Sequence, residues 1–227
     1  MPDAWPVLRE ALLDALAIVL PVACAGCGAE GRELCAACRA RLAPAPVRTS
    51  APGGLPVHAG APYREHVRRV LLACKEGRTA LAAPLAELLA AAIADAAPDA
   101  GVELCVVPST RAAFRLRGFD PARLVLARVG RRDARVLRPA RPHRAQKGLG
   151  RDERRANLRG AHRARARLDG RCFLLVDDVV TTGATLAEAA RAVRAAGGEV
   201  VGAVVVAATP LRSAGSRTRI RSSGKTE

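Results

Sequence analysis

The residues best suited to chemistry follow the apolar run Leu174–Val176, where two adjacent carboxylates, Asp177 and Asp178, precede a turn of small residues. This turn comprises Thr181, Thr182, Gly183, Ala184 and Thr185, and a helical pattern begins at Leu186. Unpaired N–H groups at a helix N-terminus attract phosphate, small residues let the backbone approach the anion, and threonine hydroxyls add donors. The carboxylates would grip sugar hydroxyls, so the segment predicts a site for a phosphorylated ribose. The competing interpretation is a strand end whose acids cap a helix.

A second constellation consists of cysteines near the N-terminus. Two Cys-x-x-Cys units lie seven residues apart and contribute Cys24, Cys27, Cys35 and Cys38. Four thiolates at this spacing can surround one tetrahedral zinc ion and leave no open position, which favours a structural metal site over a catalytic one. Redox dithiols or free cysteines are the alternatives. Because the chain holds seven cysteines, a disulfide framework is disfavoured and a reducing cytoplasm is expected.

The positive charge of the chain is concentrated in one region. The formal net charge is +16, and residues 105–172 hold 20 Arg or Lys against five Asp or Glu. This charge favours a polyanionic ligand, either pyrophosphate or nucleic acid. A compositional bias of the genome would also explain why the chain uses arginine in place of lysine. Such a bias does not explain why acidic residues are scarce in residues 105–172. The apolar stretch 11–23 is too short to span a bilayer and lacks a basic leader, so no membrane insertion is expected.

Alternating apolar strands and helical patterns predict an α/β fold with a parallel sheet covered on both faces. Helices are expected over residues 5–20, 63–75, 81–97, 118–129 and 186–196. Strands are expected over residues 102–107, 134–137, 172–176 and 200–207. The Pro- and Gly-rich residues 42–56 predict a linker or a loosely ordered edge, and residues 138–168 predict a long, charged, exposed arm. With 2% aromatic residues, the core must be largely aliphatic.

The acidic pair and its turn resemble the phosphoribosyl pyrophosphate (PRPP) motif of type I phosphoribosyltransferases. Over roughly residues 15–209 the chain resembles the ComF family, phosphoribosyltransferase-like proteins linked to bacterial DNA uptake and competence. The resemblance implies a type I phosphoribosyltransferase-like parallel sheet flanked by helices, with a small N-terminal zinc-ribbon module. The expected division is an N-terminal helix (1–20), a zinc-ribbon module and linker (21–56), the phosphoribosyltransferase-like domain (57–209) and a disordered basic tail (210–227).

The resemblance also implies roles for residues of the basic region. Ser109, Thr110 and Arg111 would lie in the loop that contacts pyrophosphate, and Arg117 begins the Arg-Gly-Phe signature. Where the family pattern has Asn-Gln after this signature, this chain has Asp120-Pro121. The alternative interpretation of these arginines is a solvated helix end.

The charged arm contains a family-like pattern of Gln146, Leu149, Arg154 and Asn157. In type I enzymes such an arm closes over the reacting centre and excludes water, and Arg154 would neutralise the departing pyrophosphate. His162 stands where the family often has an aromatic residue. A disordered basic linker is the alternative.

Two principal hypotheses follow. In the first, Asp177 and Asp178 hold the ribose of PRPP, directly or through Mg²⁺, and a base or amine displaces pyrophosphate. In the second, a non-catalytic module senses PRPP or a nucleotide and binds single-stranded DNA or a DNA-uptake or recombination partner. The scarcity of aromatic rings weighs against single-strand binding, because bases usually stack on such rings. A scaffold that has lost its activity is a third possibility, and no motif specifies the acceptor.

Overall fold

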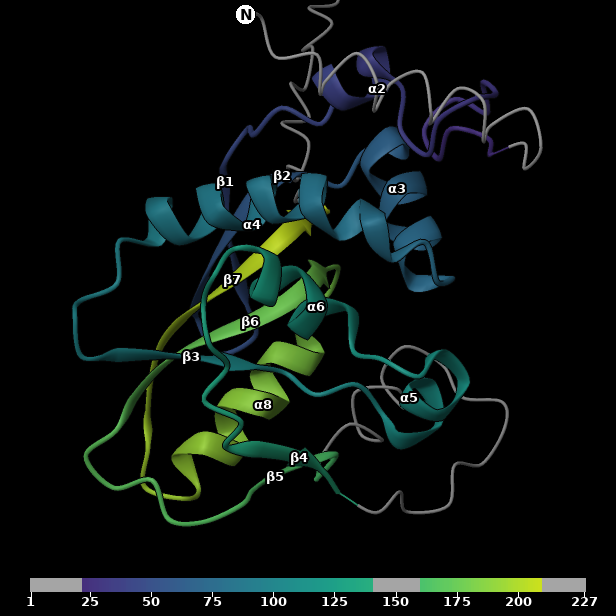
Figure 1. Cartoon of the computed structure of the whole chain (residues 1–227). Helices are drawn as coiled ribbons and strands as arrows, with labels where there is room; N and C mark the ends of the chain where they lie inside the picture. The colour runs from purple at the N-terminus through teal and green to yellow at the C-terminus, as the bar shows by residue number, and fades with distance from the viewer. Residues whose placement is uncertain (1–21, 141–159, 210–227) are drawn as a thin grey trace, which may run out of the picture.

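The structure is a computed structural model that describes residues 22–140 and 160–209 (Figure 1). The expected N-terminal helix, the arm residues Gln146, Leu149, Arg154 and Asn157, and the basic tail lie outside these ranges. The described residues contain one five-stranded sheet, a two-stranded sheet and helices on both faces of the larger sheet.

The larger sheet has the strand order β1-β2-β7-β6-β3. Its strands are β1 Val47–Ala51, β2 Leu55–Pro62, β3 Val102–Val106, β6 Cys172–Val180 and β7 Glu199–Ala208. Strands β2, β7, β6 and β3 run parallel, and β1 pairs antiparallel with β2. The two-stranded sheet joins β4 Leu137–Pro139 to β5 His162–Ala164. The expected α/β fold with a parallel-dominated sheet is therefore confirmed.

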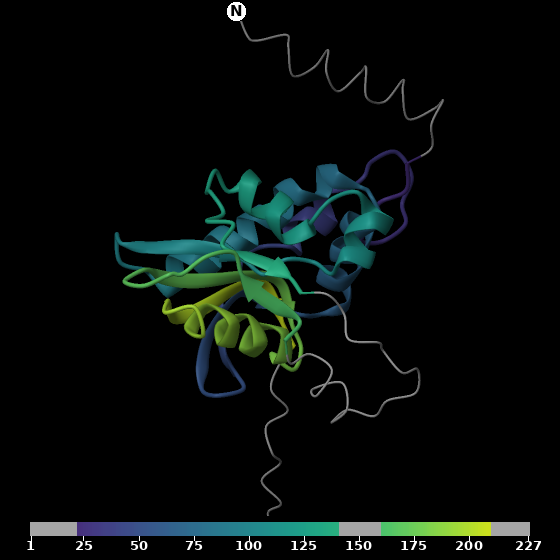
Figure 2. The same ribbon diagram turned by 90° about the horizontal axis from the view of Figure 1, so that it is seen from below.

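Helices cover the sheet in two groups, which Figure 2 shows above and below the strands. The helices are α2 Ala36–Ala40, α3 Glu65–Lys75, α4 Ala82–Ala96, α5 Arg111–Arg117, α6 Pro121–Arg128 and α8 Ala184–Arg194, with a 3₁₀ turn at Thr79–Leu81. Residues of α3, α4 and α6 share one core cluster with Leu174 and Val176, whereas α8 packs with Phe173 and Leu175. Successive side chains of β6 thus enter opposite cores, as the period of a strand requires.

Helix α4 lies directly on the sheet. A Cβ atom at Gly60 of β2 would lie 1.9 Å from the carbonyl oxygen of Leu88, so only glycine permits this approach. The stretch Thr79–Ala96 is long and apolar enough to cross a membrane, but half of it is buried inside the protein. Burial of Leu85, Leu88 and Leu89 at 0% exposure identifies it as a core helix.

The structure differs from the sequence expectations in several segments. The strand expected over 134–137 is instead β4, which begins at Leu137, and the arm expected to be exposed over 138–168 contributes most of β4, all of β5 and the buried residues His162 and Leu168. Residues 42–56 contain the ordered edge strand β1, a turn and the start of β2 rather than a linker. Strand β6 continues to Val180, because β7 still pairs with it at Ala207 and Ala208, so the two aspartates lie within the strand. The helix expected over 118–129 begins at Pro121, and the preceding residues form the separate helix α5.

Candidate functional site

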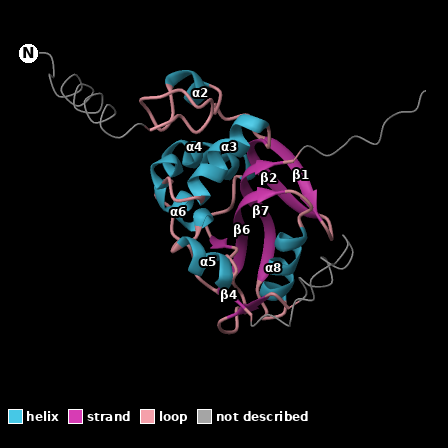
Figure 3. Cartoon of the chain, turned by 90° about the vertical axis from the view of Figure 1, so that its right-hand side faces the viewer, coloured by secondary structure: helices cyan, strands magenta, loops and turns pink. Residues whose placement is uncertain are grey.

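The candidate site lies where the carboxyl ends of β3 and β6 meet. Strand β3 pairs with β6 as far as Val106, opposite Val176, and the N–H of Val107 donates to the carbonyl of Val176 at 2.9 Å. Beyond this point, among the described strands, β6 continues beside β7 alone. After β3 the chain enters α5 and then α6 on one face of the sheet, whereas after β6 it enters α8 on the other face. Open α/β sheets bind ligands where consecutive connections diverge in this way. Figure 3 looks toward this edge, with α5 and α8 on either side of it.

The acidic pair is half-buried at this edge. Asp178 Oδ2 lies 2.9 Å from Nζ of Lys75, the last residue of α3, and Asp177 Oδ1 accepts the backbone N–H of Asp178 at 2.8 Å. Burial, and next the charge of Asp178, raises the pKa of Asp177 well above its usual range. Both side chains keep partial access to solvent, so the pair is available to a ligand.

The ion pair with Lys75 was missed by the sequence analysis. A signal for it exists in the composition, because the chain has three lysines among its 37 basic residues. A lysine in a chain that otherwise uses arginine draws attention to its position, because the two side chains are not interchangeable. Nothing in the spacing, however, indicates that Lys75 and Asp178, 103 positions apart, are in contact.

The expected phosphate loop forms a turn before α8. Gly183 is the N-cap with φ of +70°, and Thr182 Oγ1 accepts the N–H of Ala184 at 3.4 Å. Thr181 and Thr182 are exposed, whereas Thr185 is half-buried in the first helical turn. A Cβ atom at Gly183 would lie 2.6 Å from the Cβ of Ala51, so the edge strand β1 closes one side of the loop. The first N–H groups of α8 have no acceptor within the helix and can bind an anion.

The loop after β3 is held by a network from α5 and α6. The N–H of Ser109 donates to Asp120 Oδ2 at 2.8 Å, and Arg117 donates to Ser109 Oγ at 3.0 Å. Thr110 is the N-cap of α5, and its Oγ1 accepts the N–H of Ala113. Arg111 is exposed. Arg117 ends α5, but its side chain is half-buried and holds Ser109 instead of extending into solvent.

Asp120 and Pro121, which replace the Asn-Gln of the family pattern, have a structural role in this chain. The Asp120 side chain is buried, caps α6 through the N–H of Arg123 at 3.3 Å, and simultaneously binds Ser109. Pro121 occupies the first helical position, where its missing N–H costs nothing. The Asp-Pro pair thus builds the α6 terminus and fixes the loop beside the acidic pair.

The base of the expected arm is hydrogen-bonded to the loop after β3 and to helix α8. His162 Nε2 lies 3.3 Å from the carbonyl oxygen of Pro108, and Glu188 of α8 accepts the N–H of Gly160 at 2.8 Å. Burial lowers the pKa of His162. Burial alone would raise the pKa of Glu188, but hydrogen bonds from Arg191 and two backbone amides lower it. The arm residues themselves, Gln146, Arg154 and Asn157, lie outside the described ranges.

A cavity of about 400 Å³ lies between α5 and the β4–β5 hairpin. It is lined by Ser109, Arg111, Phe114, Arg115, Arg138, Pro139 and Arg165. None of its four arginines makes an ion pair with another described residue, and no acidic side chain lines the cavity. A neighbouring arginine-lined cavity of about 350 Å³ contains Asp133, which pairs with Arg123. Among the described residues, the positive charge that lines the first cavity therefore has no acidic partner.

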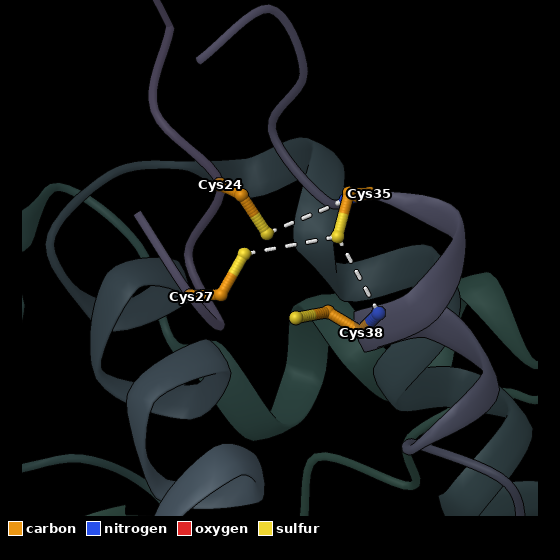
Figure 4. A group of neighbouring side chains, drawn as sticks. All are labelled: Cys24, Cys27, Cys35 and Cys38. Carbon is orange, nitrogen blue, oxygen red and sulfur yellow. Dashed lines mark hydrogen bonds between the residues drawn. The ribbon is translucent and has the colours of Figure 1, made fainter. Parts of the chain in front are cut away.

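The four cysteines meet in the N-terminal module, and their sulfurs point toward one another (Figure 4). All four Sγ atoms lie within 4.8 Å of one another, and Cys27 Sγ is 3.8 Å from Cys35 Sγ. Tetrahedral zinc–sulfur bonds of about 2.3 Å place sulfurs roughly 3.8 Å apart, so the donor set fits zinc. The described residues therefore confirm a Cys₄ cluster consistent with a zinc ribbon.

The environment of the cluster differs between its two buried cysteines. Burial raises the pKa of both, but N–H groups of Cys35, Cys27 and Gly26 lower that of Cys24 to about 6. The pKa of Cys38 is raised to about 12 by burial and the neighbouring thiols. A divalent cation would stabilise all four thiolates together.

The module is fastened to the α/β domain. Arg69 of α3 donates to the carbonyl of Gly26 at 3.2 Å, and Arg78 donates to that of Glu33 at 3.0 Å. Leu42 is buried in the core cluster under α3 and α4.

An α/β sheet whose carboxyl edge joins an acidic pair, a helix N-terminus and a basic loop has the arrangement that open α/β folds use to bind phosphorylated ligands. Sequence comparison gives the family: the phosphoribosyl transferase domain model matches residues 69–222. The chain belongs to the phosphoribosyl transferase domain family. No curated protein matches the chain.

Proposed function

We propose that this protein is a ComF-like phosphoribosyltransferase that binds Mg²⁺–PRPP and transfers the phosphoribosyl group to a base or amine with release of pyrophosphate. One observation carries the proposal: the acidic pair, the Gly183-capped end of α8 and the loop at Ser109 share one edge of the sheet. The family match supports PRPP as the substrate. The domain division given above and a cytoplasmic location are part of the same proposal.

In the proposed complex, three different parts of the site bind the 5-phosphate, the ribose and the pyrophosphate of PRPP. The 5-phosphate binds the amides and hydroxyls of Thr181, Thr182, Gly183, Ala184 and Thr185. Asp177 and Asp178 hold the ribose hydroxyls directly or through the Mg²⁺ that PRPP brings, because carboxylate oxygens suit that ion. The pyrophosphate lies against the loop of Ser109, Thr110 and Arg111, which Arg117 supports through its hydrogen bond to Ser109.

Catalysis in this proposal depends on positioning and electrostatics. The acceptor nitrogen forms a bond to the anomeric carbon as the bond from that carbon to pyrophosphate breaks, and pyrophosphate leaves with the bonding electrons. Fixed cationic groups stabilise the charge that develops on the leaving group. Arg154 of the arm supplies one such group, and Gln146 and Asn157 belong to the same closing segment.

The test compares two Asp→Asn substitutions of the same chain. Asp178→Asn removes a carboxylate from the proposed site, whereas Asp169→Asn removes an exposed one that pairs with Arg167 near the opposite edge of the sheet. We expect calorimetry to show Mg²⁺-dependent PRPP binding by the wild type and by Asp169→Asn, and a loss of at least tenfold in Asp178→Asn. Wild-type protein that binds no PRPP would refute the proposal.

Transfer is measured separately. Purified protein is incubated with PRPP, Mg²⁺ and a panel of bases and amines, and released pyrophosphate is quantified. We expect release with at least one acceptor and none from Asp177→Asn. PRPP binding without release for any acceptor would favour the sensing alternative.

The arginine-lined cavity supports a second candidate function, a PRPP-sensing module that binds single-stranded DNA. Phe114 is 46% exposed beside four arginines without acidic partners among the described residues. Single-strand binders combine such cationic grooves with stacking rings. An Arg115→Glu variant should weaken binding of a labelled oligonucleotide, whereas Arg131→Glu, in the cavity that holds Asp133, should weaken it less. Weak binding that is insensitive to salt would exclude this function.

A further inference from the structure

Among the described residues, Lys75 is the basic residue that forms an ion pair with the acidic pair. Its Nζ lies 2.9 Å from Asp178 Oδ2, and the two side chains are 28% and 17% exposed. The residue ends α3, and the preceding Cys74 is buried in the core, so the backbone from which the ammonium extends is fixed. The remaining stem is flexible enough to move the ammonium by a few ångströms.

The acidic pair places two carboxyl groups beside this one cation. Asp177 and Asp178 are adjacent, and the charge of Asp120 also acts on Asp177. The nearby Asp177 oxygen is occupied by the backbone N–H of Asp178, which is a neutral donor. Without Lys75, the edge would present closely spaced carboxylates, which is the donor type that divalent cations prefer.

We propose that Lys75 is a specificity-determining residue that occupies the cation position of Asp178 in the free protein, so that the acidic pair accepts Mg²⁺ only together with PRPP. This inference rests on the proposed function. A free divalent cation must displace the ammonium from Asp178 and leave it half-buried without a partner, which is unfavourable. Mg²⁺–PRPP brings phosphate oxygens that accept the displaced ammonium, so the exchange keeps every charge paired.

Lysine suits this exchange better than arginine does. An ammonium is a compact point charge that can pass from one oxygen acceptor to another, whereas a guanidinium binds a carboxylate through two parallel hydrogen bonds. Several arginines that pair elsewhere use that bidentate geometry, as Arg171 does with both carboxylate oxygens of Glu103 at 2.8 Å. At the acidic pair the cation is a lysine instead, and there the proposal requires that the cation leave Asp178 when PRPP binds.

The test measures free metal and PRPP separately. Binding of Mn²⁺, a paramagnetic substitute for Mg²⁺, is followed by electron paramagnetic resonance without PRPP for the wild type, Lys75→Met, Lys75→Gln and Arg68→Met. Arg68→Met removes an exposed cation of the same helix that pairs with Glu65. We expect both Lys75 variants to bind Mn²⁺ at least tenfold more tightly than the wild type, and Arg68→Met to match the wild type.

Calorimetry with Mg²⁺–PRPP provides the second measurement. Both Lys75 variants should bind PRPP at least fivefold more weakly, and adding Asp178→Asn should abolish the gain in Mn²⁺ affinity. Unchanged or weaker Mn²⁺ binding in both folded Lys75 variants would overturn the inference. That failure is distinct from failure of the proposed function, which is reported by the absence of PRPP binding to the wild type.

Discussion

The Cys₄ module and the acidic-pair edge assemble their sites over very different distances along the chain. All four cysteines come from residues 24–38 and converge within 4.8 Å. The acidic edge instead combines β6 with Lys75 of α3, Ala51 of β1 and Asp120, the N-cap of α6. A metal site with local ligands is encoded by spacing, whereas a substrate site at a sheet edge depends on which strands become neighbours.

The comparison also separates the sources of stability. The apolar side chains buried in residues 22–42 are Cys24, Cys38 and Leu42. We therefore expect metal ligation to supply much of the folding free energy of the cysteine module. The edge is supported by two aliphatic clusters, one on each face of the sheet. The module should therefore unfold when metal is lost. The acidic edge should lose stability or ligand affinity when its packing or its charges change.

The largest expected effect comes from Cys38→Ser, which removes a buried ligand of the cluster. Zinc ligation contributes on the order of 10 kcal/mol to small modules of this kind, so we expect bound zinc to fall from one ion per chain to none and the module to unfold. Elemental analysis and amide hydrogen exchange over residues 22–42 measure both effects. Cys172→Ser, outside the cluster, is the control and should keep its zinc.

The same Cys38→Ser protein tests whether the cysteine module and the acidic edge are energetically separate. If the two regions are energetically separate, its PRPP affinity stays within twofold of the wild type. A larger loss would show that the module contributes to the edge through α3, to which Arg69 fastens it.

An intermediate effect is expected for Gly183→Ala, which changes the packing of the edge. The added Cβ would lie 2.6 Å from that of Ala51, and the φ of +70° is unfavourable for alanine. We expect a loss of about 2 kcal/mol in the free energy of unfolding, measured with denaturant, and weaker PRPP binding. Gly101→Ala introduces its Cβ into open space and should change neither quantity. Equal effects of the two substitutions would contradict the close contact between β1 and the phosphate loop.

The smallest effect concerns pH and the base of the arm. Burial lowers the pKa of His162 below 6.5, so the unfolded chain binds the proton more readily and stability is lost as the pH falls below 6.5. His162→Phe removes this titration, and its free energy of unfolding should depend less on pH between 6.5 and 5. The carboxylate of Glu188, whose pKa is lowered from 4.5, contributes stability that is lost only below this window. Denaturant titrations at several pH values, with His66→Phe as the control, measure the difference; identical slopes for wild type and His162→Phe would contradict it.

The sequence alone predicted those features whose information is local. The Cys₄ spacing, the strand–turn–helix around Gly183 and the helices α3 and α4 follow from periodicity and turn chemistry over about 15 residues. The α/β class followed from the alternation of such segments, and the family resemblance pointed to the phosphoribosyltransferase fold that the domain match shows.

Tertiary structure decided what depends on neighbours distant in the chain. The sequence does not reveal that residues 47–51 add an edge strand, that Lys75 faces Asp178 or that Asp120 fixes Ser109. Strand β6 reaches Val180 because β7 lies beside it, and no local pattern contains that information. The physical reason is that local propensities act within a few residues, whereas strand order, ion pairs and close backbone approaches are set by burial of the whole core.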